Sequence, residues 1–290
     1  MQMKKNEIKI NLIIGDSRRI TKSKGAVQVS SIEGIECEEL TFIPREPWSK
    51  ISIKEFFELS TTNSNYCDIT LIKLPKKIKN QFKKIDISEC VSYNDINFIQ
   101  RTREYRSVLI SLTEYLKKHN LDNTEIIKHA IHLGKPGLKN VTFNSKENVY
   151  IGMHLDSWES NNLSSRDFSR NRICINLGKQ SRYLLYYNIS IVTMAIMIDY
   201  DIKNINFDIN YIYKSFAMAY PDWPIYKIEI QPYEAYIAPT EFMIHDGSTW
   251  GTTHPDISLV FRGKFLFKNN AVLKKLFLNI KNNIIFKKII

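Results

Sequence analysis

The chain has 290 residues, of which 43% are hydrophobic, so it can form one large domain with a substantial core. Its formal net charge of +11 favours anionic partners, but the lysines are scattered and no nucleic-acid-binding module accompanies them, which argues against nucleic-acid binding. The four cysteines form no CxxC pair, which argues against a disulfide framework or a cysteine zinc site. No stretch has the length of a membrane span or the form of a signal peptide, so we expect a cytoplasmic protein.

Two segments in the N-terminal part have the pattern of β-strands. Ile8–Ile14 alternates apolar and polar side chains, which is the period of a half-buried strand. Cys67–Leu74 is a run of β-favouring residues that Pro75 stops. These segments predict the strand part of an N-terminal buttress.

Three helices are predicted in the same part of the chain. Ser52 with Glu55, and Ser92 with Asp95, have the capping-box spacing that marks the start of a helix. The first pair predicts a short helix, and the second predicts a longer one with a single buried apolar face. A shorter helix is expected over Thr124–His132, just before a glycine.

After Gly137 the sequence changes to β-like runs separated by turn-rich segments. The runs are Val141–Phe143, Val149–Met153, Arg172–Leu177, Tyr183–Ile191, Tyr226–Ile230, Tyr233–Ile244 and Ile257–Phe267, with one helix or long loop near Ile205–Tyr220. Helices in the first half and strands in the second predict an α+β fold around a small barrel or double-sheet jelly roll. We expect one domain, with a helix-and-strand buttress over residues 1–139, a core over 140–267 and a basic tail over 268–290.

His154 and Asp156 lie two positions apart at the end of a predicted strand. Side chains two apart on a strand leave the same face, so this imidazole and carboxylate can bind one metal ion. Two histidines and one carboxylate on one face of Fe(II) leave positions open for a co-substrate and dioxygen, and zinc accepts the same ligands. By itself a His-x-Asp pair is a weak signal, and a solvent-facing pair at a strand end is the alternative.

The run Glu234–Gly247 (EAYIAPTEFMIHDG) supplies a third ligand candidate. It resembles the segment before the distal metal-binding histidine in 2-oxoglutarate-dependent Fe(II) oxygenases. In that segment an acidic residue is followed by an apolar run, a polar kink (here Thr240) and a histidine (here His245), with a glycine close behind.

The resemblance covers roughly residues 140–267 and implies a double-stranded β-helix, a cupin-like jelly roll. It also implies that His154, Asp156 and His245 hold Fe(II). Related halogenases have a small residue in place of the carboxylate, which leaves a coordination position for chloride. Because Asp156 is present, the resemblance favours oxygenation, desaturation or ring formation over halogenation.

The same resemblance predicts the binding site for 2-oxoglutarate. Asp256-Ile-Ser-Leu-Val-Phe-Arg-Gly looks like the last core strand, on which these families place an arginine for the far carboxylate. Ser258 and Arg262 fall on one face of that strand, as an anchoring hydroxyl and guanidinium should. Arg182 is the alternative anchor, because a long stretch separates His245 from the last strand.

Other histidines and aromatic residues compete for roles near the metal. His254 is the alternative to His245 as third ligand, but it lies in a turn-like stretch before a proline, so we favour His245. His129 and His132 fall on the predicted helix and are expected on its solvated face. A substrate pocket is expected to draw on Trp158, Arg182, Tyr183, Trp250 and His254.

These expectations describe an Fe(II)- and 2-oxoglutarate-dependent oxygenase acting on a small molecule, an amino acid or a peptide, free or bound to a carrier protein. The alternatives are a cupin-like metal enzyme that does not use 2-oxoglutarate, and a non-catalytic β-sandwich that binds an acidic partner. The apolar and lysine-rich segment Ala271–Ile290 is expected to pack as an amphipathic helix on its own domain, with a homodimer contact or a membrane-surface element as alternatives.

Overall fold

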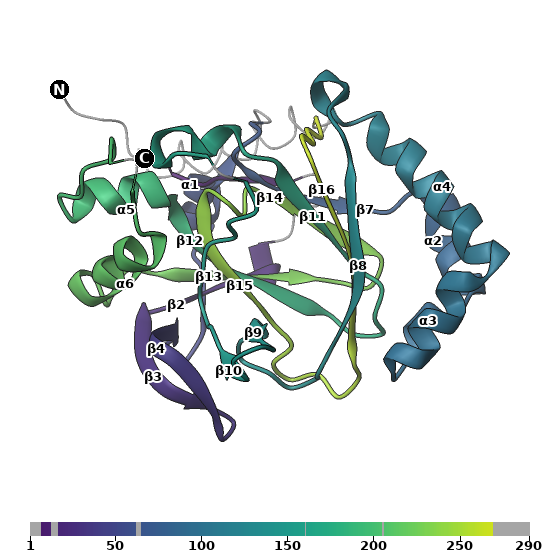
Figure 1. The fold of residues 1–290 in the computed structure, drawn as a ribbon, viewed down its shortest axis with the longest axis horizontal. Helices are drawn as coiled ribbons and strands as arrows, with labels where there is room; N and C mark the ends of the chain where they lie inside the picture. The colour runs from purple at the N-terminus through teal and green to yellow at the C-terminus, as the bar shows by residue number, and fades with distance from the viewer. Residues whose placement is uncertain (1–6, 13–16, 62–64, 160, 205, 269–290) are drawn as a thin grey trace, which may run out of the picture.

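The computed structural model describes residues 7–12, 17–61, 65–159, 161–204 and 206–268. The chain forms a mixed α/β fold with large, mostly antiparallel sheets that do not close into a barrel (Figure 1). The expected combination of helices and a β-rich core is confirmed.

The largest sheet has seven strands in the order β6-β1-β7-β14-β11-β16-β8. Their bounds are β6 (Ser60–Thr61), β1 (Ile10–Leu12), β7 (Ile69–Lys73), β14 (Glu234–Ala238), β11 (Asn171–Asn176), β16 (Asp256–Gly263) and β8 (Ile127–Gly134). β1 runs parallel to β6 and β7, and the other neighbours in this sheet are antiparallel.

A second sheet has five antiparallel strands, and a third has four. The five are, in order, β15 (Met243–Ser248), β12 (Arg182–Ser190), β13 (Ile225–Ile230), β2 (Ile20–Ser23) and β5 (Ser49–Lys50). The four are β3 (Ala26–Ile32), β4 (Ile35–Pro44), β10 (Val149–Tyr150) and β9 (Phe143–Asn144).

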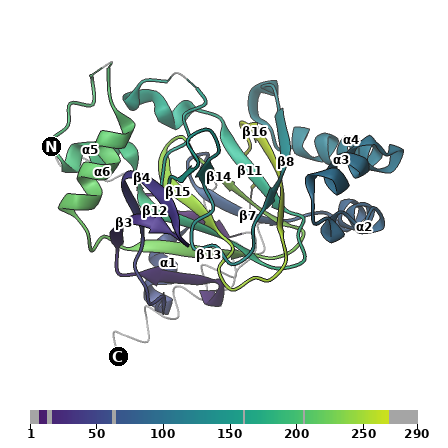
Figure 2. The same cartoon turned by 60° about the horizontal axis from the view of Figure 1, so that its bottom comes forward.

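Helices flank the strands on two sides (Figure 2). One side carries α2 (Lys76–Lys84), α3 (Tyr93–Arg101) and α4 (Arg103–Lys117), and the other carries α5 (Ile191–Met197) and α6 (Ile209–Ala219). The short helix α1 (Ile53–Leu59) contacts β6. Short 3-10 turns are η1 (Ser17–Arg19), η2 (Ile87–Glu89), η3 (Leu121–Asn123) and η4 (Leu163–Phe168). Phe82 and Leu112 pack with Ile173 of β11, whereas Phe216 packs with Tyr187 of β12.

The space between the two large sheets forms a separate core. Along β11, Ile173 and Ile175 belong to the core under the helices, while Cys174 between them packs with Leu184 and Tyr236 of the interior. Because alternate side chains of a strand face opposite ways, Arg172 on the same strand also faces this interior.

From β8 onward the strands pair in a nested order, in which the first segment pairs with the last and each later one pairs further inward. β12 pairs with β13, β11 with β14, the backbone at His154 with β15, and β8 with β16, all antiparallel. Segments that are far apart in the sequence therefore become neighbours, and the centre of the nest is the β12–β13 pair.

The prediction of a helix over Thr124–His132 is wrong. The chain forms the strand β8 there, which pairs with β16 over almost its whole length. Ile131 is 2% exposed in the core under the helices, so tertiary pairing outweighs the local helical pattern. His129 and His132 consequently lie on an edge strand of the seven-stranded sheet rather than on a helix.

The prediction of a single strand over Tyr233–Ile244 is also wrong. The segment divides into β14 and β15, which belong to different sheets. Pro239 lies at the break, and its carbonyl accepts hydrogen bonds from the amides of Phe242 (2.8 Å) and Met243 (3.1 Å). This turn carries the chain from one sheet to the other.

The helix that begins after Ser92 is capped as predicted, since Ser92 and Asp95 form both hydrogen bonds of a capping box. It divides at Thr102 into α3 and α4. Ser52 likewise accepts a hydrogen bond from the amide of Glu55 at the start of α1. Within the described ranges no helix is long and apolar enough to cross a membrane. The expected C-terminal helix over Ala271–Ile290 lies outside the described residues.

Candidate metal centre

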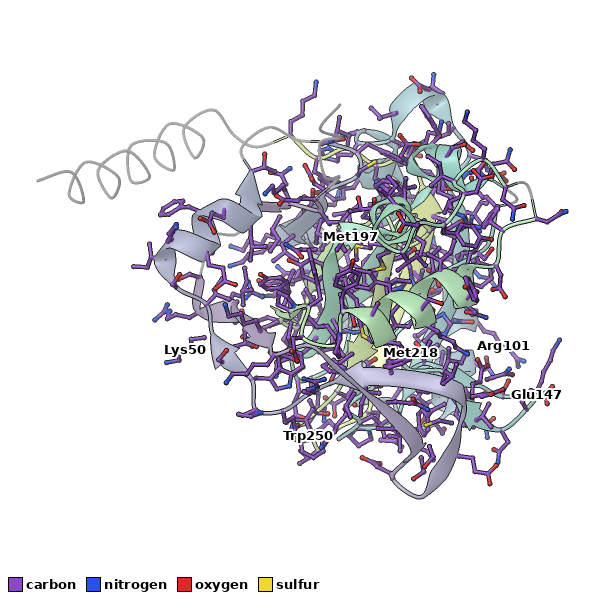
Figure 3. All side chains as sticks on the ribbon, turned by 90° about the vertical axis from the view of Figure 1, so that its left-hand side faces the viewer. Lys50, Arg101, Glu147, Met197, Met218 and Trp250 are labelled. Atoms are coloured by element: carbon purple, nitrogen blue, oxygen red, sulfur yellow. The ribbon has the colours of Figure 1, made fainter. Side chains whose placement is uncertain are left out.

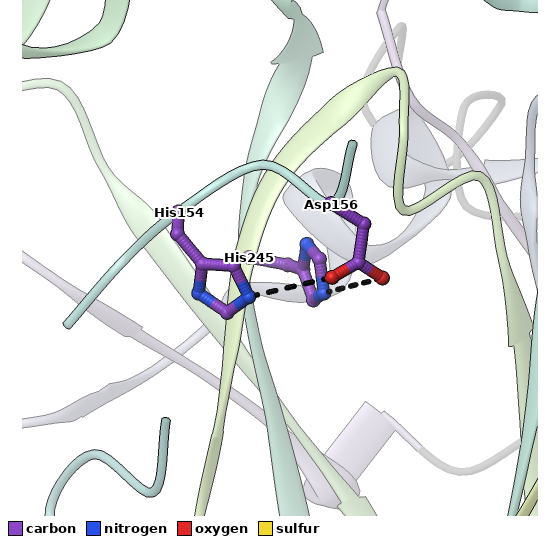
Figure 4. Close-up of side chains that lie close together, drawn as sticks. All are labelled: His154, Asp156 and His245. Atoms are coloured by element: carbon purple, nitrogen blue, oxygen red, sulfur yellow. Dashed lines mark ion pairs between the residues drawn. The ribbon is translucent and has the colours of Figure 1, made fainter. Parts of the chain in front are cut away.

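His154, Asp156 and His245 come together at one end of the interior (Figure 4). One ligand atom from each lies within 4.8 Å of the others. His154 Nε2 is 3.5 Å from Asp156 Oδ1, and His245 Nε2 is 3.8 Å from Asp156 Oδ2. Two imidazoles and a carboxylate at these separations can share one divalent metal ion, as predicted from the sequence.

The backbone fixes two of these residues directly against each other. The amides of His154 and His245 each donate to the other's carbonyl, at 2.9 and 2.8 Å. The amide of Asp156 donates to the carbonyl of Thr240 at 3.0 Å. His154 therefore lies on the chain segment directly beside β15, the strand that carries His245.

Gly152 sets the approach of this segment. It has a φ of +72°, and a Cβ there would lie 2.8 Å from the carbonyl oxygen of Phe42 and 2.7 Å from the Thr41 side chain. Only glycine fits this left-handed position so close to β4. The turn delivers His154, two residues later, to its place beside β15.

The imidazoles are oriented for metal binding in the same way. His154 Nδ1 is 3.0 Å from the carbonyl oxygen of Gly152, and His245 Nδ1 is 3.2 Å from that of Met243. A carbonyl accepts only, so each ring places a proton on Nδ1 and turns its other nitrogen, Nε2, toward Asp156. His245 Nε2 is buried and has no hydrogen-bond partner among the described residues, as expected for a nitrogen atom that coordinates a metal.

Burial and neighbouring charges act on all three ligands. Burial alone would lower the pKa of His154, but the adjacent Asp156 and Asp246 carboxylates outweigh it and raise that pKa. Burial lowers the pKa of His245 to about 3, so this imidazole is neutral. Burial alone would raise the pKa of Asp156, but the hydrogen bond to His154 and the Arg172 guanidinium outweigh it and hold that pKa well below its usual range. Arg172 contacts Asp156 Oδ2 at 3.2 Å and so fixes the carboxylate's orientation.

A cavity of about 550 Å³ adjoins the three ligands. It is lined by Ile35, Tyr93, His132, Leu133, Gly134, Lys135, Leu138, Val141, Thr142, Phe143, Tyr150, His154, Asp156, Trp158, Arg172, Arg182, Asp256 and Ser258. Its lining holds the cations Lys135, Arg172 and Arg182 but only two carboxylates, Asp156 and Asp256. The size suits a small organic co-substrate together with part of a substrate.

The structure brings some of the predicted pocket residues to this cavity and leaves others elsewhere. Trp158, Arg182 and Ser258 line it. Tyr183, which follows Arg182 in the sequence, instead lines a separate, shallow polar depression. Trp250 is 44% exposed at the surface (Figure 3), under the Lys139 ammonium.

His254 lies in an exposed loop, as expected. Its amide donates to Gln180 Oε1 at 2.9 Å, and its Nδ1 is 3.2 Å from the Thr253 hydroxyl. It is not part of the three-residue ligand group, and its neighbours in the loop account for its contacts.

Arg262 already has two carboxylate partners. Its Nη2 is 3.0 Å from Glu241 and 3.1 Å from Glu159, and its guanidinium lies 5.4 Å from the centre of the Trp158 ring. Glu159 also pairs with Arg170 at 2.9 Å. This charge cluster ties the loop after Asp156 to β16, and Arg262 is not among the residues that line the cavity.

Sequence reasoning missed Arg172, the cation closest to the ligand group. The available signal was a charged residue inside the apolar run Asn171–Asn176, where alternation predicts one interior-facing position in two. Comparisons of the chain with protein-family models, curated proteins and solved structures gave no match. The function is therefore inferred from the geometry of the site.

Proposed function

We propose that this protein is an Fe(II)- and 2-oxoglutarate-dependent oxygenase that hydroxylates, desaturates or cyclises a small molecule, an amino acid or a peptide. The observation that carries the proposal is the His154–Asp156–His245 group at the end of a cavity in which cations outnumber carboxylates. Iron and 2-oxoglutarate, when bound, would supply the oxidising chemistry, with dioxygen consumed and succinate and CO2 released.

The nested strand pairing supports the double-stranded β-helix expected for such an enzyme. A long antiparallel hairpin that is rolled up pairs its first segment with its last and its second with the one before last, which gives two facing sheets. β8 with β16, the backbone at His154 with β15, β11 with β14, and β12 with β13 follow this order.

The ligand group supports iron binding by a preformed site. Both histidines present Nε2, Asp156 is held ionised, and Arg172 keeps the carboxylate in place. Three protein ligands on one side of the ion leave the side toward the cavity open for other ligands. Zinc would accept the same ligand atoms.

Arg182 is the better anchor for the far carboxylate of 2-oxoglutarate. Its side chain is 7% exposed, and its Nη1 lies 3.5 Å from Asp256 and 3.1 Å from the Cys174 sulfur. Gly247 makes room for it, because a Cβ there would lie 3.0 Å from Arg182 Nη2. Gly247 is two residues from His245 on the same strand, so the guanidinium lies close to the metal end of the cavity.

Ser258 lines the same cavity as Arg182 and offers it a hydroxyl. An arginine that is already desolvated forms a strong charge-assisted contact with a carboxylate. Arg262, by contrast, would have to give up Glu241 or Glu159 to bind a co-substrate. The anchor is therefore assigned to Arg182 and Ser258 in place of Arg262.

The test is an anaerobic titration of the purified protein with Fe(II) and 2-oxoglutarate. The expected result is a weak visible absorption band that requires both, followed by 2-oxoglutarate-dependent succinate release in air. Iron binding without either signal would instead support a cupin-like metal enzyme that does not use 2-oxoglutarate. Absence of metal binding, with salt-sensitive binding of a polyanion, would support a non-catalytic binding protein.

A further inference from the structure

The cavity beyond the metal ligands has a distinct charge and surface character. Its only lining carboxylates are Asp156 and Asp256. Asp156 lies against His154 and Arg172, and Asp256 pairs with Arg182 at 3.5 Å. No lining carboxylate is left to accept an ammonium group.

Cations remain in excess in the same cavity. Lys135 lies at its edge and has no ion pair among the described residues, while Arg172 has Asp156 as its carboxylate partner. A bound divalent ion and a bound dicarboxylate cancel each other's charge, so the excess persists in the loaded site. An ammonium group in the cavity would be repelled at distances of several ångströms, and a carboxylate would be attracted.

The outer end of the cavity is aromatic. Tyr93, Phe143 and Trp158 line it, and they are 55%, 38% and 57% exposed. They come from α3, β9 and the loop after Asp156, three separate parts of the chain. Apolar side chains exposed together around a cavity mouth mark a surface for an apolar ligand.

We propose that the substrate is an apolar organic acid without a free ammonium group, whose body contacts the aromatic mouth and whose acid group is drawn to Lys135. This inference rests on the proposed function for the reaction, and it narrows the substrate class. Free amino acids are excluded by it, whereas N-blocked acids and simple apolar carboxylates fit.

The test uses three probes of one shape: 3-phenylpropanoate, 3-phenylpropanamide and 3-phenylpropylamine. Their dissociation constants are measured by calorimetry in protein loaded with Mn(II) and saturating 2-oxoglutarate under anaerobic conditions. We expect the acid to bind about fivefold tighter than the amide, since a solvent-accessible ion pair contributes up to about 1 kcal/mol, with the amine weakest.

Substitutions test which residues contact the bound probes. Lys135→Gln should remove the acid's advantage over the amide, whereas Lys139→Gln, whose lysine pairs with Glu46 and lies over Trp250, should not. Trp158→Ala should weaken the acid and the amide alike. Equal or tighter binding of the amine, or an unchanged preference in Lys135→Gln, would overturn the inference.

Competition separates this inference from the proposed function. An acid probe whose dissociation constant rises in proportion to 2-oxoglutarate concentration occupies the co-substrate end, which contradicts the inference but not the oxygenase. If 2-oxoglutarate does not bind, yet the Lys135-dependent preference for the acid persists in the metal-free protein, the proposed function falls and the substrate class stands.

Discussion

Arg172 and Arg262 lie directly opposite each other on β11 and β16, yet their guanidinium groups serve different partners. Arg172 contacts the candidate metal ligand Asp156 at 3.2 Å, and Arg262 contacts Glu241 at 3.0 Å. Two like charges on opposed positions of a sheet repel unless each is neutralised. Arg172 therefore serves the part of the interior that holds the metal ligands and faces the cavity. Arg262 serves the part that holds the loop after Asp156 in place.

Loss of a metal ligand should abolish tight iron binding. His154→Ala, Asp156→Ala and His245→Ala each remove one of three ligand atoms, so we expect the iron dissociation constant to rise at least tenfold, measured by equilibrium dialysis. His254→Ala is the matched control, because its side chain contacts Thr253 in a loop. Iron binding that survives in His245→Ala but is lost in His254→Ala would reverse the assignment of the third ligand.

The two anchor candidates can be separated by binding measurements. Arg182→Met should weaken 2-oxoglutarate binding about tenfold or more, because a hydrogen bond to a charged group contributes about 1.5–3 kcal/mol, and should leave iron binding nearly unchanged. Arg262→Met should spare 2-oxoglutarate binding. The opposite pattern would return the anchor to Arg262.

Arg262→Met should act on stability instead. It leaves the carboxylate of Glu241, which is 1% exposed, without its closest cation, and breaking a buried pair in this way costs about 3–5 kcal/mol. Adding Glu241→Gln should restore part of the loss, because no unpaired charge then remains. Urea unfolding of both single variants and the double variant measures this coupling, and strictly additive losses would contradict it.

The pH dependence of stability should carry a signature of Asp68. Burial raises the pKa of this carboxyl from 3.8 to about 6, and the amide of Lys9 opposes the shift only in part. The folded state then binds more protons than the unfolded state between about pH 4 and 6, so stability falls as pH rises through that window. A shift of this size corresponds to about 3 kcal/mol.

Asp68→Asn should remove that fall. We expect the free energy of unfolding of this variant to change less between pH 4 and 7 than that of the original chain, as measured by urea denaturation at each pH. Parallel curves for the two proteins would show that Asp68 does not titrate in this range.

The ligand group could be predicted because its three residues lie in two short, recognisable sequence segments. His154 and Asp156 are two positions apart, and His245 was indicated by the resemblance of Glu234–Gly247 to the segment before the distal metal-binding histidine of 2-oxoglutarate-dependent Fe(II) oxygenases. The positions of Arg182 and Arg262 could not be read in this way. Arg182 lines the cavity, whereas Arg262 is held by Glu159 and Glu241, which reach it only through the tertiary fold.

The β-rich character of the second half could be predicted, but the connections between its strands could not. The β-rich second half was expected, but the passage of the chain from one sheet to the other at Pro239 lies inside a run that was interpreted as a single strand. β8 was mistaken for a helix because its residues pair with β16, a segment more than a hundred positions away that a local pattern cannot represent.

The nested pairing has a consequence for how the protein is made. β8 can pair with β16 only after β16 has been synthesised, and the backbone at His154 can pair only after β15 has been synthesised. Neither pair can therefore form until most of the chain has left the ribosome. Contacts this distant in sequence slow folding and leave strand edges open during synthesis. A metal ion that binds across His154 and His245 would bind only the completed fold, and the supply of that metal would then influence how much of the newly made protein survives.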